Sequence, residues 1–159
     1  MSTKKDKFSQ KDKNFMKLAI SLARARKGLT GDNPSVGCII VKNDKIISIG
    51  QTGYSGRPHA EHNAIKNSFE ELKGSKMYVT LEPCALCATA IAFARIRKLV
   101  FGAYDPKGGG VEHGPRIFNQ PTIHHAPEVI GGVMETKCAS ILKTFFSERR
   151  YKNQNLCKQ

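Results

Sequence analysis

Residues 77–87, MYVTLEPCALC, join the pattern of a strand directly to the start of a helix. From Met77 to Leu81 the side chains are largely aromatic or β-branched, which favours a strand. Pro83 suits the first turn of a helix, because its missing N–H leaves no helical hydrogen bond unmade there. The alanine-rich residues that follow predict a helix reaching to about Arg95. A strand followed at once by a helix is a unit of an α/β fold.

Strand and helix patterns alternate on both sides of this segment. Apolar residues recur at helical spacing before Gly28 and again after His59, and two β-branched runs around a turn predict a hairpin. These patterns predict a mixed sheet with helices packed on its faces. The expected elements are helices at 14–28, 59–74, 83–95 and 135–151, strands at 36–41, 46–50, 77–81 and 99–101, and a long loop at 104–127.

The composition suits a single globular domain, since the chain has 159 residues of which 40% are hydrophobic. The longest run of low polarity, residues 85–94, is far shorter than the roughly 18 apolar residues of a membrane span. The N-terminus is charged and lacks the apolar segment of a secretory signal. We therefore expect a soluble protein of the cytoplasm, in which closely spaced cysteines serve metal or redox chemistry.

The charge of the chain is strongly positive and unevenly distributed. The formal net charge is +13, with +7 in residues 1–28, none in residues 29–94 and +6 in residues 95–159. Basic ends around a neutral centre suit a polyanionic partner, although a solvated lysine-rich arm and an amphipathic helix would give the same distribution. The expected organisation is a flexible basic arm at 1–13, a domain at 14–151 and a tail at 152–159.

Two short motifs at expected helix starts point to a metal site. His59 is followed two residues later by Glu61, and Cys84 is followed three residues later by Cys87. Residues three apart lie on one face of a helix, so both thiolates can reach one ion, and His59 supplies a third ligand. A catalytic zinc ion held by three protein ligands leaves its fourth position to water and lowers the pKa of that water toward about 7. The motifs predict one Zn²⁺ per chain.

Glu61 is the expected general acid and base beside that metal. A carboxylate that does not bind the ion can take a proton from the water and deliver it to a ring nitrogen and a leaving amine. The motif pair H-x-E and P-C-x-x-C is the signature of zinc-dependent nucleobase deaminases. Two other interpretations are a thioredoxin-type redox pair and a closed structural site in which His62 is a fourth ligand.

From residue 77 onward the chain resembles bacterial tRNA adenosine deaminases of the cytidine deaminase-like superfamily. The resemblance is carried by YVTLEPCALC (residues 78–87), FGAYDPKGG (residues 101–109), HHAPE (residues 124–128) and the ending around Phe145 and Arg150. It implies a three-layer α/β/α fold with a mixed five-stranded sheet, a homodimer, and conversion of wobble adenosine to inosine. Substrate contacts are implied at Asn33, Ala60 and Pro83.

The first half of the chain resembles a second branch, the pyrimidine deaminase domain of riboflavin biosynthesis. NPSVGC (residues 33–38) and GRPHAE (residues 56–61) carry this likeness, and Gln51 stands where tRNA enzymes usually have asparagine. Riboflavin deaminases usually carry a longer insertion between their cysteines and a reductase domain, and neither is present here. This branch implies a phosphorylated pyrimidine as the substrate.

The charge distribution favours the tRNA branch. An enzyme that acts on a base within RNA must hold the flanking phosphates, which calls for cations around a neutral pocket. The anticodon loop of a tRNA is therefore the expected partner, ahead of a riboflavin precursor, a free nucleobase or nucleoside, and a non-catalytic zinc-stabilised RNA-binding role. The expected phosphate contacts are Arg95, Lys107, Arg116, Arg149, Arg150 and Lys152.

Overall fold

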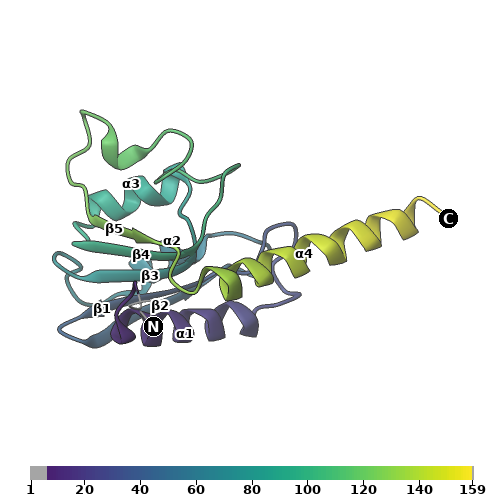
Figure 1. Ribbon diagram of the computed structural model, residues 1–159, viewed down its shortest axis with the longest axis horizontal. Helices are drawn as coiled ribbons and strands as arrows, with labels where there is room; N and C mark the ends of the chain where they lie inside the picture. The colour runs from purple at the N-terminus through teal and green to yellow at the C-terminus, as the bar shows by residue number, and fades with distance from the viewer. Residues whose placement is uncertain (1–6, 159) are drawn as a thin grey trace, which may run out of the picture.

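The computed structural model describes residues 7–158, which form one mixed sheet covered by helices on both faces (Figure 1). The strand order is β2-β1-β3-β4-β5. β1 runs antiparallel to β2 and β3, while β3, β4 and β5 are parallel. This confirms the predicted three-layer α/β/α fold with its mixed five-stranded sheet. The strands are β1 (Gly37–Lys42), β2 (Lys45–Gln51), β3 (Lys76–Leu81), β4 (Lys98–Ala103) and β5 (Glu128–Gly131).

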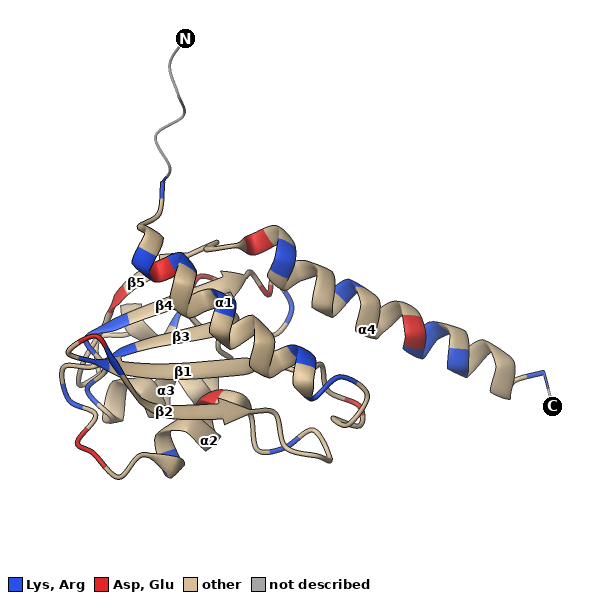
Figure 2. Ribbon diagram, turned by 90° about the horizontal axis from the view of Figure 1, so that it is seen from below, with Lys and Arg blue, Asp and Glu red and all other residues tan. Residues whose placement is uncertain are grey.

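The helices divide into two pairs. α2 and α3 pack on one face of the sheet, and α1 and α4 pack on the other (Figures 1 and 2). α2 and α3 also contact each other. The two helices that begin with the metal-ligand motifs therefore lie side by side over the same face. The helices are α1 (Gln10–Ala25), α2 (Ala60–Asn67), α3 (Ala85–Phe93) and α4 (Glu135–Leu156), with a short 3₁₀ helix at Ile117–Asn119.

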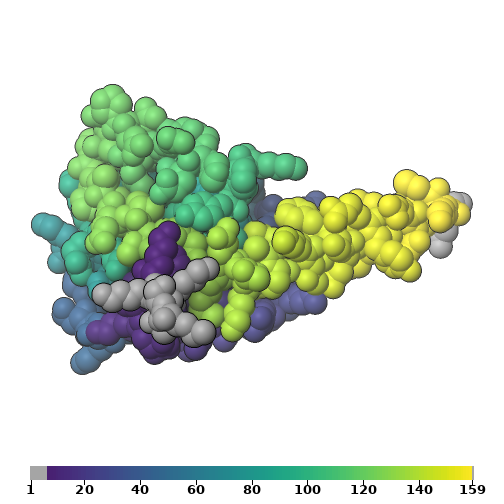
Figure 3. Space-filling model, viewed as in Figure 1, coloured from purple at the N-terminus to yellow at the C-terminus, as the bar shows by residue number. Residues whose placement is uncertain are grey.

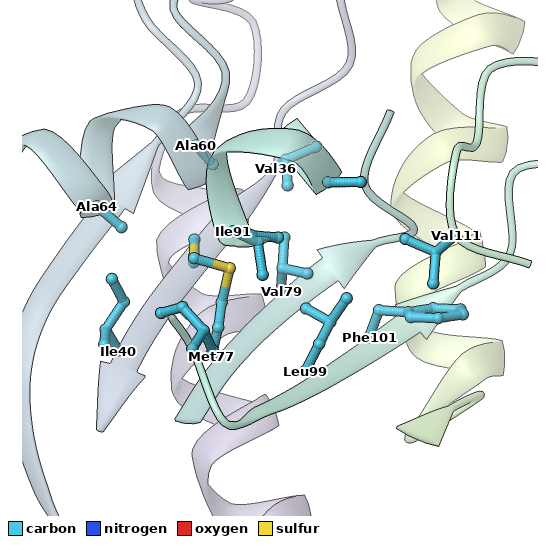
Figure 4. Close-up of a cluster of buried hydrophobic side chains, with 13 residues drawn as sticks. Val36, Ile40, Ala60, Ala64, Met77, Val79, Ile91, Leu99, Phe101 and Val111 are labelled. Atoms are coloured by element: carbon cyan, nitrogen blue, oxygen red, sulfur yellow. The ribbon is translucent and has the colours of Figure 1, made fainter. Parts of the chain in front are cut away.

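The alternation of side chains along the central strands builds two cores. Val79, Leu99 and Phe101 point toward α2 and α3, where they pack in a fully buried cluster (Figure 4). Their neighbours Tyr78 and Val100 point to the opposite face and pack against α1 and α4. Residues next to each other in a strand face opposite sides of the sheet, so this alternation holds both helical layers on β3 and β4.

The largest differences from the predicted helix boundaries are at the start of α1 and at the ends of α2 and α4. α1 begins at Gln10, because Ser9 caps it by accepting a hydrogen bond from the Asp12 backbone N–H, so the expected arm at 1–13 is too long. Residues 1–6 of that arm lie outside the described residues. α2 ends at Asn67, seven residues before the expected stop, where the Ser68 hydroxyl binds nearby backbone instead.

The last helix is longer than predicted. α4 continues to Leu156, so residues 152–156 of the expected tail are helical. No glycine or proline interrupts the helix after residue 135, and the basic and amide side chains near its end tolerate helical backbone. The second half of α4 projects beyond the body of the domain (Figure 3). None of the helices within residues 7–158 combines the length and apolarity needed to span a membrane.

A buried ion pair ties α1 to the sheet. The Asp12 carboxylate accepts a hydrogen bond of 2.7 Å from the Tyr78 hydroxyl and lies 3.3 Å from the Lys98 ammonium. Burial alone raises the pKa of Asp12, but hydrogen bonding to Tyr78 and Ser9 and the charge of Lys98 outweigh it, and the net pKa lies below the ordinary value of 3.8. The folded protein therefore favours the charged carboxylate.

Asp12→Asn is expected to lower the free energy of unfolding by roughly 1–3 kcal/mol at neutral pH, because it leaves the nearly buried Lys98 ammonium without its partner. A carboxylate with a lowered folded pKa stabilises the fold above its unfolded pKa and loses that effect as the pH falls. The difference between parent and variant should therefore shrink below about pH 4. Urea denaturation at several pH values measures this, and a difference independent of pH would contradict it.

Candidate metal centre and active site

The three predicted metal ligands come from the starts of two neighbouring helices. His59 is the N-cap residue of α2, and Cys84 is the N-cap residue of α3. Neither side chain caps its own helix, so both are available to point across the gap between the helices. Cys87 lies in the first turn of α3, on the same side as Cys84, and is almost fully buried.

These side chains converge on one point. Nδ1 of His59 lies 3.6 Å from Sγ of Cys84 and 3.6 Å from Sγ of Cys87. All three ligand atoms lie within 4.8 Å of one another. One imidazole nitrogen and two sulfurs at this spacing fit a Zn²⁺ ion, which when bound would supply Lewis acidity and an activated water. His62 is exposed on α2 and does not join this group, so a closed site with four ligands from the described residues is not formed.

The electrostatics of the two sulfurs suit metal binding. A hydrogen bond from Cys87 holds the pKa of the Cys84 thiol well below its ordinary value, and His59 acts in the same direction although burial opposes both. The pKa of His59 is raised by its contact with Cys84. The thiolate is the form that binds metals, and this arrangement favours it at Cys84.

Glu61 lies beside the ligands without being one of them. Its side chain is 4% exposed and lines the same cavity as His59 and Cys84. Burial raises the pKa of Glu61 to about 7, against the opposing effects of a backbone hydrogen bond and of His59. A buried carboxylate at the edge of a cavity, next to a metal site, has the position needed to transfer protons to a bound molecule.

The cavity beside these residues has a volume of about 240 Å³ and is large enough for a nucleobase. Asn33 lies in its wall, held by a hydrogen bond of 2.8 Å from its Nδ2 to the Gly56 carbonyl oxygen, and its contact with substrate stays a prediction. Arg57 also lines the cavity and was not singled out from the sequence. Its position two residues before His59 in the sequence could have indicated that it lies near the metal site. Arg57 brings a cation to the wall of the cavity.

Two other expected substrate contacts are placed differently. The Ala60 side chain is fully buried in the core beneath α2, so only its backbone would be available to a substrate. Pro83 is buried, and its carbonyl oxygen accepts a hydrogen bond of 2.8 Å from Gly110. Substrate binding by Ala60 and Pro83 remains a prediction.

The expected phosphate contacts belong to several different elements of the fold. Lys107 lies in the loop next to the cavity, between Asp105 and Gly108. Arg95 follows the C-cap residue of α3 and donates a hydrogen bond to the His124 carbonyl oxygen. Arg116 precedes the 3₁₀ helix with a left-handed backbone, and Arg150 is on the exposed part of α4 beside Ser147. Of these cations, Lys107 is the one placed closest to the cavity wall.

Arg149 has a structural partner inside the chain. Its guanidinium donates to the Gly31 carbonyl oxygen at 2.9 Å and pairs with Asp32 at 2.6 Å. These residues immediately precede Asn33, so α4 is attached to the loop that forms one wall of the cavity. Lys152 lies nearby in a groove of about 570 Å³ between α4 and the end of α1. Whether these cations contact RNA remains a prediction.

Comparisons with known proteins agree with this geometry. The family model of the cytidine and deoxycytidylate deaminase zinc-binding region matches residues 9–103. The chain is 45% identical to a tRNA-specific adenosine deaminase of Agrobacterium fabrum, covering 86% of this chain and 95% of that protein. It is 40% identical to the riboflavin biosynthesis protein RibD of Aquifex aeolicus, covering 86% of this chain but only 39% of that protein.

Solved structures give relatives of the same two kinds. A structure from work on A-to-I editing by tRNA:A34 deaminases matches with a TM-score of 0.71 at 42% identity, over 80% of this chain and 98% of that one. A diaminohydroxyphosphoribosylaminopyrimidine deaminase and reductase of Thermotoga maritima matches with a TM-score of 0.74 at 35% identity, over 89% of this chain and 42% of that one. Because the matched region contains both helix starts that carry the ligand side chains, the chain belongs to the zinc-dependent cytidine and deoxycytidylate deaminase family.

Proposed function

We propose that this protein is a tRNA adenosine deaminase, which converts the wobble adenosine of an anticodon to inosine and releases ammonia. The observation that carries the proposal is the 45% identity that extends over 95% of a tRNA-specific adenosine deaminase. The spacing of Cys84 and Cys87, without the longer insertion typical of riboflavin deaminases, supports the same branch. We propose the cytoplasm as the place where the protein acts, because a tRNA substrate would be found there.

The residues around the cavity would have distinct roles in this reaction. His59, Cys84 and Cys87 would hold the zinc ion. Water adds to the carbon that bears the amino group, and a Glu61 carboxylate oxygen takes one of its protons and passes it to the ring nitrogen. A further proton then reaches the amino group, the carbon–nitrogen bond breaks, and ammonia leaves while the carbonyl of the product forms. Asn33 faces the bound base from the cavity wall.

The cations near the cavity would hold the backbone of the anticodon loop. Arg57 lines the cavity, and Lys107 lies in the loop on its other side. A base that is turned out of an RNA loop brings its flanking phosphates to the rim of the pocket, where such side chains can neutralise them. The lysines and arginines along the projecting α4 lie farther out, where a longer RNA would reach them (Figure 2).

The riboflavin pyrimidine is the second candidate substrate. It is favoured by the 40% identity to RibD and by the arginine that enters the cavity two residues before His59. A single cation at this position could hold the phosphate of a small substrate. The two candidates differ in size and not in the chemistry of the reaction, so the same four residues would act on either.

A direct comparison of substrates tests the proposal. The protein is incubated separately with an adenosine-bearing anticodon stem-loop and with the diaminopyrimidine phosphate, and ammonia release and product mass are measured. We expect inosine in the stem-loop and no change in the pyrimidine. Deamination of the pyrimidine alone would replace the first candidate with the second. Salt-dependent binding of the stem-loop without ammonia release would instead indicate a non-catalytic RNA-binding protein.

We further propose that the active form is a homodimer that pairs through the outer face of α3. This helix is apolar around its circumference, yet Leu86 is 68% exposed and Phe93 is 66% exposed. A helix that is apolar on all sides is normally buried, so a second copy of the chain is the partner that would cover the exposed side.

Leu86→Glu is expected to convert the dimer to a monomer, because a charge placed in an apolar interface loses its hydration without gaining a partner. Light scattering coupled to gel filtration measures the mass. Leu156→Glu is the matched control, since Leu156 is equally exposed but lies at the far end of α4. A parent protein that is monomeric at every concentration tested, or a dimer that tolerates Leu86→Glu, would contradict the proposal.

A further inference from the structure

Glu82 is a buried carboxylate that the metal site and the proton transfer do not use. Its side chain is completely inaccessible to solvent. One oxygen, Oε1, accepts hydrogen bonds from the backbone N–H groups of Val111, Glu112 and His113 at 2.8 to 3.3 Å. The other oxygen, Oε2, accepts from the Asp105 N–H at 2.9 Å and lies 2.8 Å from Nδ1 of His113. An isolated buried carboxylate is costly, so these partners are what allow it to remain there.

All five partner atoms belong to one loop, residues 105–113. The loop contains neither strand nor helix, so its backbone N–H groups have no hydrogen-bond partners from a helix or a sheet ladder and need other acceptors. Four of them converge on Glu82. Gly110 adds a hydrogen bond to the carbonyl oxygen of Pro83, the residue that follows Glu82. The glycine-rich loop is therefore wrapped around the end of β3, immediately before the first cysteine ligand.

Close packing makes this arrangement specific. A Cβ atom added to Gly109 would lie 2.5 Å from Oε1 of Glu82 and 2.5 Å from the Asp105 carbonyl oxygen. A Cβ atom added to Gly110 would lie 2.5 Å from the backbone nitrogen of Ala85. Both positions require glycine because the loop backbone approaches the carboxylate and the start of α3 directly.

The same loop forms a wall of the substrate cavity. Asp105 and Gly108 line that cavity together with Asn33 and Arg57. The Asp105 carboxylate also accepts hydrogen bonds from the backbone of Lys107 and Gly108, which makes this end of the loop a tight turn. Any displacement of residues 105–113 would therefore change the width of the cavity and the position of the Lys107 backbone at its rim.

We propose that Glu82 is a positioning residue that holds loop 105–113 as a wall of the substrate cavity and thereby sets the affinity for the nucleobase substrate. The inference rests on the proposed function only for the identity of that substrate. Glu82 also lies in the lining of the cavity, but its side chain has no solvent-accessible surface and both carboxylate oxygens are held by residues 105–113. Its effect therefore passes through the backbone of the loop. Substrate binding, and not the proton transfer at Glu61, is the step that depends on it.

Glu82→Gln tests the proposal because it preserves the shape of the side chain. Its amide NH₂ group replaces one acceptor oxygen and faces a backbone N–H, so at least one hydrogen bond of the loop is lost. We expect faster hydrogen exchange at the amides of residues 105–113, a KM raised about tenfold, and kcat within about threefold of the parent. Zinc content is expected to be unchanged.

Asp12→Asn is the matched control, since Asp12 is also a buried carboxylate but lies on the opposite face of the sheet. It should reduce stability without changing either KM or exchange in the loop. His113→Ala, which removes one partner at a half-exposed position, should give a smaller change of KM in the same direction, and it tests the proposal even if Glu82→Gln does not fold.

Three results would overturn the proposal. The first is unchanged hydrogen exchange in residues 105–113 of Glu82→Gln, or of His113→Ala if Glu82→Gln does not fold. The second is a fall in kcat with KM unchanged, and the third is loss of zinc, which would place the effect at the metal site. Failure of the proposed function is distinguishable, because a parent that deaminates neither candidate substrate leaves the exchange measurement able to decide the role of Glu82.

Discussion

Glu61→Gln is expected to retain zinc and fold normally while losing two to four orders of magnitude in kcat, the range typical of general acid and base catalysis. Glutamine preserves the size of the side chain, so the core beneath α2 stays packed. It carries no carboxylate, and therefore it cannot take a proton from water and return it to the ring nitrogen. The measurements are metal content by mass spectrometry and single-turnover deamination of the anticodon stem-loop.

The pair of measurements separates a proton-transfer residue from a residue that supports the fold. Loss of zinc or of thermal stability in Glu61→Gln would show that the buried carboxylate supports the metal site instead. Normal turnover would remove Glu61 from the mechanism. Substrate binding provides a further check, since the variant should still bind the stem-loop with an affinity close to that of the parent. A catalytic carboxylate acts on the barrier and leaves ground-state binding largely intact.

The metal site was predictable from the sequence because its chemistry depends on short-range spacing. Cys84 is the N-cap residue of α3 and Cys87 lies in its first turn, so a spacing of three residues brings both sulfurs to the start of one helix. Pro83, expected in the first helical turn, lies immediately before the N-cap. Only the tertiary fold brings His59 next to the two cysteines. This contact could still be expected, because parallel crossover connections place their helices on the same face of a sheet. The sequence alone therefore predicts the ligand set His59, Cys84 and Cys87.

The fifth strand was implied by the family resemblance and was not visible in the local sequence. Residues 128–131, Glu-Val-Ile-Gly, contain two apolar residues, and none of the four is fully buried. Their extended backbone is held by parallel pairing with β4, in which Val129 lies opposite Leu99. The strand that pairs with this segment lies about thirty residues earlier in the chain, and four residues are too few to show a periodic pattern of apolar side chains.

The role of Glu82 could not be predicted from the sequence, for a related reason. Its partners are backbone N–H groups 23 to 31 residues later, and backbone groups carry no residue-type signal. The contact between Arg149 and the loop before Asn33 spans 117 residues and likewise has no local pattern. Short motifs identified the chemistry of the site, whereas the walls of its cavity depend on long-range contacts that only the fold displays.

Cys87→Ala is expected to reduce zinc from about one equivalent per chain to a small fraction and to abolish deamination, because a catalytic zinc site needs all three protein ligands. Cys138→Ala is the matched control: Cys138 is an equally buried cysteine, but it lies on α4 on the opposite face of the sheet. Both variants remove one buried sulfur from a core, so both should lose a similar amount of packing energy. Only Cys87→Ala should lose the metal.

A second control separates a catalytic site with three ligands from a closed site with four. His62→Ala should keep both zinc and activity, because His62 is exposed and does not point its ring at the sulfurs of Cys84 and Cys87. Loss of zinc in His62→Ala would require α2 to rearrange when the ion binds, and would favour the closed structural site. Retention of zinc in Cys87→Ala would mean that the ion is held elsewhere. Metal content alone therefore decides which side chains hold the ion, independently of the substrate the protein acts on.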